Sequence, residues 1–487
     1  MKVGADPRAG LRAGRLRFFR TIAESVGVQG PTGGVVITAA VLAGVSGGGT
    51  ALVQVVAAVA MGFVAYAFVI FTRGFNSAGS VYGFTGAVAG SAIGFLSAWT
   101  LLLVYVNFAG GVYISTADEA RPAFAAIGLH LPWPVYAVIA FVLVMAFAGA
   151  DIRLSAAVIL AVEAASMLLV VIASAIIVAK GGYHGHAFST APLRPDGVGV
   201  ATLGLGVVLS FSAFSGFEAA ATLGEEARQP QRVIPAAIAI SLAVVAIFEI
   251  GVTAVVTNAY PATARLAAAP VPLVSITDRY VAPWMGDLVN FAAVISSFGA
   301  ALACAVAGSR ILFALGRDGF GPRMLRRTSR RTGSPGGALI WVGAGSLVTL
   351  LLFVGEPTAT RAVAISLSYG ADLIIAAYTL VVAAAIVFAV RRRMSAVTIL
   401  VLLAGLAVLG YVVKDTFIPL PSAPYRWDAL AAAISLIAGI ALPLAIPGLR
   451  RGIRTSPLLR AGAIALLPAA SARPATAPGP DNDPHQA

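Results

Sequence analysis

Two stretches of this chain place small and polar residues inside runs of apolar side chains. The first is VGVQGPTGGV (26–35), and the second is FSAFSGFEAAATLGEEARQP (211–230). Glycine and proline interrupt helices, and an interrupted helix leaves backbone N–H and C=O groups without intrahelical partners. Free N–H groups at a helix start bind a carboxylate, while free carbonyls accept hydrogen bonds from an ammonium. The two breaks therefore predict a site for a ligand that carries both groups.

Four acidic residues lie well inside apolar segments, namely Glu163, Glu218, Glu249 and Asp372. A charged side chain in lipid is costly, so an acid in such a segment predicts a functional role. Glu218 directly follows the second break, where it could cap freed N–H groups or carry a proton. Asp372 follows Gly370 and is a candidate for a gate or a proton path. No role is predicted for Glu249.

Long apolar segments must position these residues. Of the 487 residues, 59% are hydrophobic and only 11% are charged, whereas soluble domains carry about 25% charged residues. We identify twelve segments long enough to cross a bilayer as helices, and no signal peptide. The sequence therefore predicts an all-α polytopic membrane protein with twelve transmembrane helices. The spans cover 26–46, 51–72, 88–115, 131–149, 154–179, 198–222, 233–256, 286–315, 337–354, 361–390, 396–414 and 428–447.

The two breaks fall in the first and sixth spans, five spans apart. Because five is odd, a second five-helix unit would enter the membrane with the opposite orientation. Matched breaks of this kind are typical of inverted-repeat transporters with the substrate site at the breaks, although a lone glycine often serves only close helix packing. Two six-helix halves would instead place the breaks six spans apart. The predicted organisation is a basic arm (1–22), a first repeat (23–180), a second repeat (198–390), two further helices (394–448) and a disordered Ala/Pro-rich tail (449–487).

The net charge of +13 follows the membrane topology. With the N-terminus inside, 25 of the 33 Lys and Arg residues fall in inside segments, as the positive-inside rule requires. This bias predicts a multi-pass protein of the cell (plasma) membrane with both termini cytoplasmic. The basic loop RMLRRTSRR (323–331) could contact nucleic acid, but an anchor to anionic lipid is the favoured interpretation. The expected partners are thus the lipid bilayer and a small substrate, with no nucleic acid.

Several motifs resemble one known family. The string FSGFEAAATLGEEARQPQRVIPAAI (214–238) is similar to the sixth helix and following loop of the amino acid–polyamine–organocation (APC) superfamily. Three further stretches agree: NSAGSVYGFTGAVAGSAIGFLSAWTLLLVY (76–105), GSRILFALGRDGFGP (308–322) and GPTGGV (30–35). The resemblance implies an amino acid permease with a five-plus-five inverted repeat, broken helices 1 and 6, and two added C-terminal helices.

The resemblance also implies the roles of the residues at the two breaks. The substrate α-carboxylate would meet helix 1, and the α-amine would meet helix 6 carbonyls near Phe211, Ser212 and Phe214. An aromatic ring of helix 6 would cover the site, with Phe214 as the first candidate and Phe217 as the second. The expected substrate-binding residues are Gln29, Gly30, Thr32, Gly33, Gly34, Phe211, Ser212, Phe214, Ser215, Gly216 and Phe217.

Coupling residues are expected on helices 5, 6, 8 and 10. Some proton-coupled relatives carry a lysine on helix 5, and Ser166 lies near that place here, so a lysine relay is not expected. Ser296 and Ser297 could contribute hydroxyl oxygens to a Na⁺ site, since hard cations prefer oxygen ligands, or could bond helix to helix. The expected coupling or gating residues are Glu218, Glu163, Asp372, Ser296 and Ser297.

The predicted function is secondary active transport of an amino acid, by symport with H⁺ or Na⁺ or by exchange. No cofactor is expected, and no Walker loop occurs that would bind ATP. The Gly, Ser, Thr and Phe residues of the breaks favour a neutral or apolar amino acid, and a related amine or polyamine is the alternative. A membrane-embedded enzyme would need clustered His and acidic residues, and a non-transporting nutrient sensor would need a signalling domain. Glu225 and Glu226 lie near Arg228 and Arg232 at the end of the sixth span, where they could form a cytoplasmic gate with the basic loops or could be solvated charges at a helix end.

Overall fold

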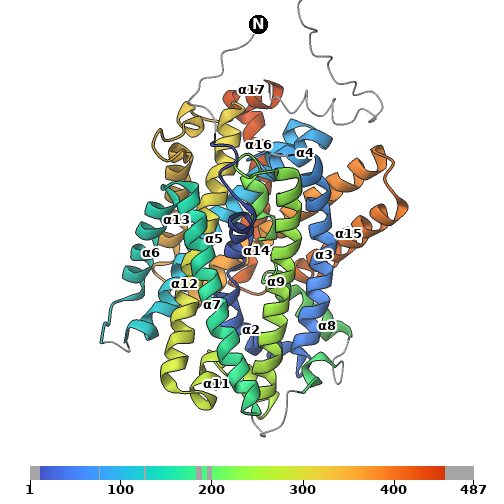
Figure 1. Ribbon diagram of the computed structural model, residues 1–487. Helices are drawn as coiled ribbons and strands as arrows, with labels where there is room; N and C mark the ends of the chain where they lie inside the picture. Colours follow the sequence, from blue (N-terminus) through green and yellow to red (C-terminus); the bar gives the residue numbers. More distant parts are fainter. Residues whose placement is uncertain (1–10, 76, 126–127, 183–188, 195–199, 456–487) are drawn as a thin grey trace, which may run out of the picture.

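The molecule is a bundle of long helices whose axes are roughly aligned (Figure 1). The computed structural model describes residues 11–75, 77–125, 128–182, 189–194 and 200–455, and no named strand occurs within these ranges. Among the described residues, ten helical segments are long and apolar enough to cross a membrane, with the joined stretch Phe18–Ser46 counted as one. The structure is thus that of an all-helical polytopic membrane protein, and the arrangement of twelve spans as an inverted repeat stays a prediction.

The helices follow the predicted spans with few shifts. The first span is α1 (Phe18–Gln29) joined to α2 (Pro31–Ser46). Its break therefore lies in the middle of the span, whereas the sequence had indicated a break near the start. The sixth span is α8 (Val200–Phe211) followed by a turn and the 3₁₀ helix η3 (Phe217–Leu223). The other predicted spans correspond to the helices α3 (Thr50–Gly74), α5 (Ser91–Ala125), α6 (Trp133–Ala148), α7 (Ile152–Ala179), α9 (Pro230–Ala259), α12 (Pro283–Arg317), α13 (Gly336–Phe353), α14 (Ala359–Arg391), α15 (Ala396–Phe417) and α16 (Tyr425–Ala445). Of these, α6 has only 16 residues and is not among the ten segments.

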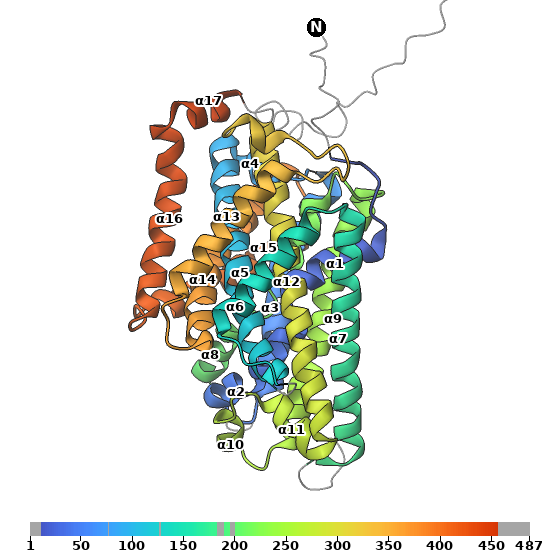
Figure 2. The same cartoon turned by 90° about the vertical axis from the view of Figure 1, so that its left-hand side faces the viewer.

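Short helices cover the two ends of the bundle. The helices α4 (Val81–Ala89) and α17 (Pro447–Thr455) lie at one end, and α10 (Thr263–Ala267) and α11 (Pro272–Tyr280) lie at the other (Figures 1 and 2). The tail predicted to be disordered from residue 449 therefore begins within the helix α17. This helix is amphipathic and carries several arginines. The rest of that tail and residues 1–10 of the basic arm lie outside the described residues.

The long helices α5 and α12 occupy the centre and pack against each other. Helices at the rim expose large apolar side chains, such as Leu352 on α13, Leu400 on α15 and Ile434 on α16. Exposed apolar patches of this size are not stable in water, but they suit contact with lipid acyl chains. Figure 2 shows α16 at the edge of the bundle, beside α14.

Candidate functional site

The two helix breaks lie directly against each other. Gly30 ends α1 in the left-handed region, with φ 52° and ψ 53°, and Pro31 begins α2. Gly216 has a φ of +106°, and a Cβ atom there would lie 2.6 Å from Val28 Cγ1 and 3.1 Å from the Gln29 backbone nitrogen. Only glycine tolerates this backbone conformation and this close approach. The contact brings together two stretches nearly 190 residues apart in the sequence.

A serine of α1 satisfies the unwound backbone of the sixth span. The Ser25 hydroxyl donates to the Phe217 carbonyl (2.5 Å) and accepts from the Ala220 N–H (2.9 Å). Unwound backbone inside a membrane is tolerated only where protein groups or a cavity satisfy it. Ser25 thus holds η3 against α1, a role that sequence reasoning missed because Ser25 precedes the glycine-rich motif.

Glu218 caps the break in the sixth span. Its carboxylate accepts hydrogen bonds from the Gly216 N–H (3.1 Å), the Tyr105 hydroxyl (2.9 Å) and the Tyr378 hydroxyl (2.6 Å). The side chain is fully buried. The three donors come from the break itself, from α5 and from α14, so Glu218 joins three elements at this level of the bundle.

The aromatic residues of the sixth span are buried in the protein interior. Phe217 packs edge to face on Phe68 of α3, with ring centroids 5.5 Å apart, and tilted on Tyr378 at 5.4 Å. Phe211 contacts the ring of Tyr378 at 6.1 Å, and Phe214 is fully buried. Phe217 therefore lies in an aromatic cluster with α3 and α14, which leaves Phe214 as the better candidate to cover a ligand.

Other predicted contact groups are partly engaged. The Ser212 carbonyl accepts hydrogen bonds from the backbone N–H (3.2 Å) and the hydroxyl (2.7 Å) of Ser215, and the Gly34 N–H donates to the Gly30 carbonyl (3.1 Å). In contrast, Gln29 donates through Nε2 to the Ser25 carbonyl (2.9 Å), while its buried Oε1 has no partner. An unsatisfied buried acceptor is costly, so Gln29 Oε1 is a candidate contact for a ligand ammonium.

Glu163 and Ser296 meet beside the first break. The Ser296 hydroxyl on α12 donates to Glu163 Oε2 on α7 at 2.9 Å, and the buried Glu163 Oε1 has no partner. One helical turn further along α7, Ser166 donates to the Glu163 carbonyl (3.1 Å) and accepts from the Thr32 hydroxyl (3.1 Å). The structure thus connects two of the predicted coupling residues to α2.

Ser297 lies beside an acid that the sequence analysis missed. Its hydroxyl donates to Glu119 Oε1 (3.1 Å), which also accepts from Ser115 (3.3 Å), while Glu119 Oε2 is buried without a partner. A Cβ atom on Gly33 would lie 2.6 Å from the Ser297 hydroxyl oxygen. Glu119 was missed because the third predicted span ended at residue 115, whereas α5 continues to Ala125.

Glu249 approaches the same turn of α2 from α9. Its Oε2 accepts from Gln54 Nε2 at 3.4 Å, and a Cβ atom on Gly34 would lie 3.5 Å from its Oε1. Glu119 and Glu249 thus approach the first turn of α2 from two different helices, and Glu163 is connected to it through Ser166. Within the described residues they form no group that could hold a metal ion together.

Asp372 is placed apart from the breaks. It lines a pocket between α14, α15 and α16 together with apolar residues of those helices. Within the described residues, the Asp372 side chain forms no hydrogen bond or ion pair with the residues of the breaks, so its role in coupling or gating stays a prediction.

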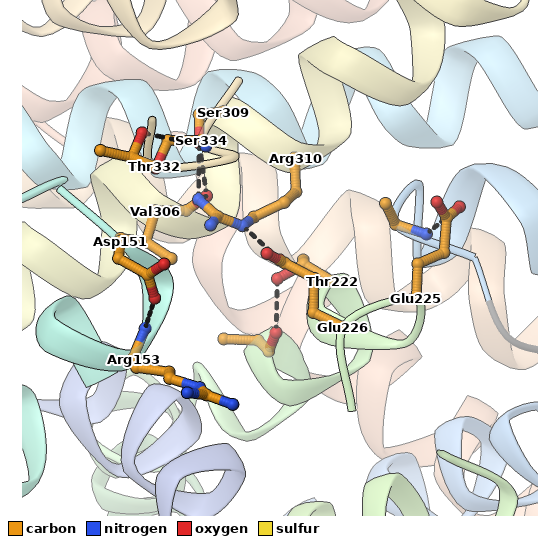
Figure 3. A network of polar contacts seen from close by, with 12 residues as sticks. Asp151, Arg153, Thr222, Glu225, Glu226, Val306, Ser309, Arg310, Thr332 and Ser334 are labelled. Carbon is orange, nitrogen blue, oxygen red and sulfur yellow. Dashed lines mark hydrogen bonds and ion pairs between the residues drawn. The ribbon is translucent and has the colours of Figure 1, made fainter. Parts of the chain in front are cut away.

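Two buried or half-buried ion pairs join the segment that follows η3 to the C-terminal part of α12. Arg310 donates through Nε to Glu226 at 2.9 Å (Figure 3). Both side chains are almost fully buried. Arg317 binds Glu225 through two parallel hydrogen bonds of 2.8 and 2.9 Å. The partners of Glu225 and Glu226 thus come from α12, whereas the nearby Arg228 bonds the carbonyl of Gly14 (2.9 Å).

A short backbone pairing lies at this same end. The Leu16 N–H donates to the Glu226 carbonyl (3.0 Å), and the Arg228 N–H donates to the Leu16 carbonyl (2.9 Å). The guanidinium of Arg12 bonds the carbonyls of Arg330 and Arg331. The residues just before α1 therefore cross the end of the bundle and hold the segment that follows η3.

Comparison with known proteins agrees with this architecture. A family model described as amino acid permease matches residues 16–441. The chain therefore belongs to the amino acid permease family, within the APC superfamily. It is a multi-pass membrane transport protein and not an enzyme.

Individual relatives are similar over parts of the chain. A branched-chain amino acid permease of Bacillus subtilis is 26% identical over 323 residues, which cover 63% of this chain and 69% of the relative. A mitochondrial cationic amino acid transporter of Arabidopsis thaliana is 26% identical over 348 residues, 67% of this chain and 56% of the relative. A methylthioribose transporter of Bacillus subtilis is 27% identical over 349 residues, 67% of this chain and 72% of the relative.

Proposed function

We propose that this protein is a secondary active transporter that moves amino acids across the cell membrane by alternating access. The observation that carries the proposal is the direct packing of the Gly30 break against the Gly216 break. Two interrupted helices in contact present helix-end donors and acceptors to one ligand. The family membership independently supports an amino acid as that ligand.

The substrate groups would bind the two helix ends that face each other across the breaks. The α-carboxylate would bind the N-terminus of α2, where the N–H groups of Thr32 and Gly33 have no intrahelical acceptor and Pro31 has no N–H. The α-ammonium would bind the carbonyl end of α8 at Phe211, the Phe214 carbonyl and Gln29 Oε1. The opposite ends of the two helix dipoles favour this orientation.

A neutral or apolar side chain on the substrate is our first candidate. The glycine and serine residues of the breaks carry no charge that would select an ionic side chain. A cationic amino acid or an amine is a second candidate, because the buried Glu119 Oε2 beside Gly33 has no partner in the protein. A substrate ammonium could supply that partner. The named relatives include a branched-chain permease and a cationic transporter.

Glu163 is our candidate for the coupling group. Its buried carboxylate has one hydroxyl donor and, within the described residues, no basic partner in an ion pair. A proton would remove the cost of burying its charge. A sodium ion at Ser296 and Ser297 is less favoured by the geometry, because the two hydroxyls bind different carboxylates on α7 and α5.

Counterflow into proteoliposomes tests the proposal. Purified protein is reconstituted and challenged with a panel of labelled neutral and cationic amino acids and amines, with and without a proton or sodium gradient. We expect saturable uptake of at least one amino acid and loss of proton-driven accumulation in Glu163→Gln with exchange retained. Absence of counterflow for the whole panel would refute amino acid transport.

The same assay separates the two substrate candidates. If the substrate is cationic, Glu119→Gln should raise KM for it at least about tenfold, since a charge-assisted hydrogen bond is lost. If the substrate is neutral, the same substitution should change KM little. Uptake by the matched variant Glu356→Gln, at an exposed pair, should equal that of the wild type in both cases.

A further inference from the structure

A pocket of about 570 Å³ lies away from the helix breaks, between α14, α15 and α16. We call it the peripheral pocket. Its walls include Leu96 of α5, Ile375 of α14, Phe417 of α15, and Ala433 and Leu436 of α16. Its volume falls within the range of sites that hold organic ligands, about 300–1,000 Å³. The size and the apolar walls suit a compact hydrophobic body.

One acidic side chain lines this apolar pocket. Asp372 has 7% of its surface exposed, and within the part of the chain that the structure describes it receives no hydrogen bond and no ion pair. Asp428 at the start of α16 lies close enough for its charge to act on Asp372. Asp428 is 8% exposed, and its Oδ2 is buried without a partner. The pocket is therefore lined by one acid, and a second buried acid lies nearby.

Among the residues that the structure describes, no basic side chain forms an ion pair with either of these acids. Lys414 on α15 is exposed, and the guanidinium of Arg426 lies over the ring of Trp427, 4.8 Å from its centroid. Of the described ion pairs, none involves Asp372 or Asp428. Burying a carboxylate without a counter-charge is costly. A cationic ligand in the pocket would remove that cost.

We infer that the peripheral pocket binds an organic ammonium with an apolar body, the ammonium at Asp372, near Asp428, and the apolar body against α14, α15 and α16. An ammonium has three donors and no acceptor, so it complements two carboxylates with free oxygens. The apolar walls exclude a small hydrated cation, which would need further oxygen ligands. The site is separate from the transport site, and its binding can be measured without transport.

Equilibrium binding of labelled phenylbutylamine tests the inference. The protein is placed in nanodiscs of phosphatidylcholine and phosphatidylglycerol, and specific binding is defined by excess unlabelled amine. We expect saturable binding by the wild type, and an affinity at least about tenfold lower in Asp372→Asn, because a charged acceptor is lost. Phenylbutanol, which has the same apolar body without the charge, should not compete.

Two further variants control this experiment. Ala433→Phe fills the pocket while both carboxylates remain, so it should also weaken binding at least about tenfold. This variant keeps the test decisive if Asp372→Asn is not recovered as folded protein. Asp415→Asn removes an acid of α15 that does not line the pocket, and it should bind as the wild type does.

A second lipid composition identifies the source of the ammonium. If phosphatidylethanolamine in the nanodisc suppresses amine binding, the ligand is a lipid headgroup amine, and if it has no effect, the ligand is a soluble amphipathic amine. Equal binding by the wild type, Asp372→Asn and Ala433→Phe would overturn the inference. Equal competition by phenylbutanol would also overturn it, since the pocket would then hold only apolar chains beside neutral acids.

Discussion

At the scale of single residues, a missing side chain allows the two breaks to meet. Gly216 has backbone angles that other residues rarely adopt, and the space where its Cβ would stand is filled by Val28 and Gln29 of α1. Ser25 and Glu218 then satisfy the N–H and C=O groups that the break exposes. The break is therefore maintained by a small set of specific contacts.

Gly216→Ala should abolish transport while the protein still inserts in the membrane. The new methyl group would lie 2.6 Å from Val28 Cγ1 and would push η3 away from α1. We expect uptake to fall to background in proteoliposomes, with normal yield after size-exclusion chromatography. Gly62→Ala is the matched control, because open space surrounds Gly62 and its uptake should be unchanged. Wild-type uptake by Gly216→Ala would remove η3 from the proposed site.

Glu218→Gln should destabilise the protein by about 1–3 kcal/mol, the typical cost of leaving a buried hydrogen-bonding group unsatisfied. The carboxylate accepts from three donors, whereas a glutamine side chain offers one acceptor oxygen and places an NH₂ group against the remaining donors. Thermal unfolding in detergent measures the loss. Glu356→Gln, at the partly exposed pair with Arg361, serves as the control. An equal melting temperature for both variants would contradict the proposed capping role of Glu218.

At the scale of elements, α12 carries polar groups that act at two levels of the bundle. Ser296 and Ser297 reach the acids around α2, and Arg310 and Arg317 bind the two glutamates after η3. Residues 310 and 317 are two helical turns apart, so both side chains face the same neighbour. α12 thereby fixes both the first and the sixth span.

Arg310→Met should lower the free energy of unfolding by about 3–5 kcal/mol, as expected when one member of a buried ion pair is removed. Glu226 would be left buried without its partner, and Glu24, a fully buried acid whose charge interacts with Arg310, would lose a nearby cation. Arg361→Met at the exposed pair with Glu356 should cost about 0–1 kcal/mol. Chemical or thermal unfolding of both variants measures these losses of stability. A similar loss in the two variants would show that burial does not make the Arg310 pair more important.

At the scale of the whole molecule, the distribution of basic residues predicts how the bundle is oriented. The basic residues 323–331 follow the C-terminal end of α12, whereas α10 and α11 lie at the opposite end of the bundle (Figure 1). The positive-inside rule places the arginine-rich end in the cytoplasm. Both ends of the described chain lie toward that same end (Figure 2).

Cysteine labelling tests this orientation. The chain has a single cysteine, Cys304, which is buried, so the background reaction should be low. In intact cells a membrane-impermeant maleimide should label Ala268→Cys, in the segment between α10 and α11, and should leave Ser329→Cys unlabelled. Permeabilised cells should show label on both variants. The reverse pattern in intact cells would mean that the topology is inverted.

The sequence predicted the helices well where apolar length alone decides them. The largest error was at α5. Its last ten residues, which come directly after Ser115 and include several polar side chains, were assigned to a loop. Tertiary packing keeps that stretch helical, and Asn290 of α12 bonds the carbonyl of Glu119 there (3.0 Å). As a result, sequence reasoning missed an acid beside the first break.

By itself the sequence determined the membrane class, the family and the positions of both breaks, because apolar length, basic bias and glycine motifs are local properties. Only the tertiary structure decided which groups meet: Glu163 with Ser296, Glu119 with Ser297, and Glu225 and Glu226 with the arginines of α12. It also separated Asp372 from the breaks and placed it in the peripheral pocket with the C-terminal helices. Contacts between residues far apart in the chain depend on how the helices are rotated and packed. The sequence of one helix does not show which face of a neighbouring helix it will meet.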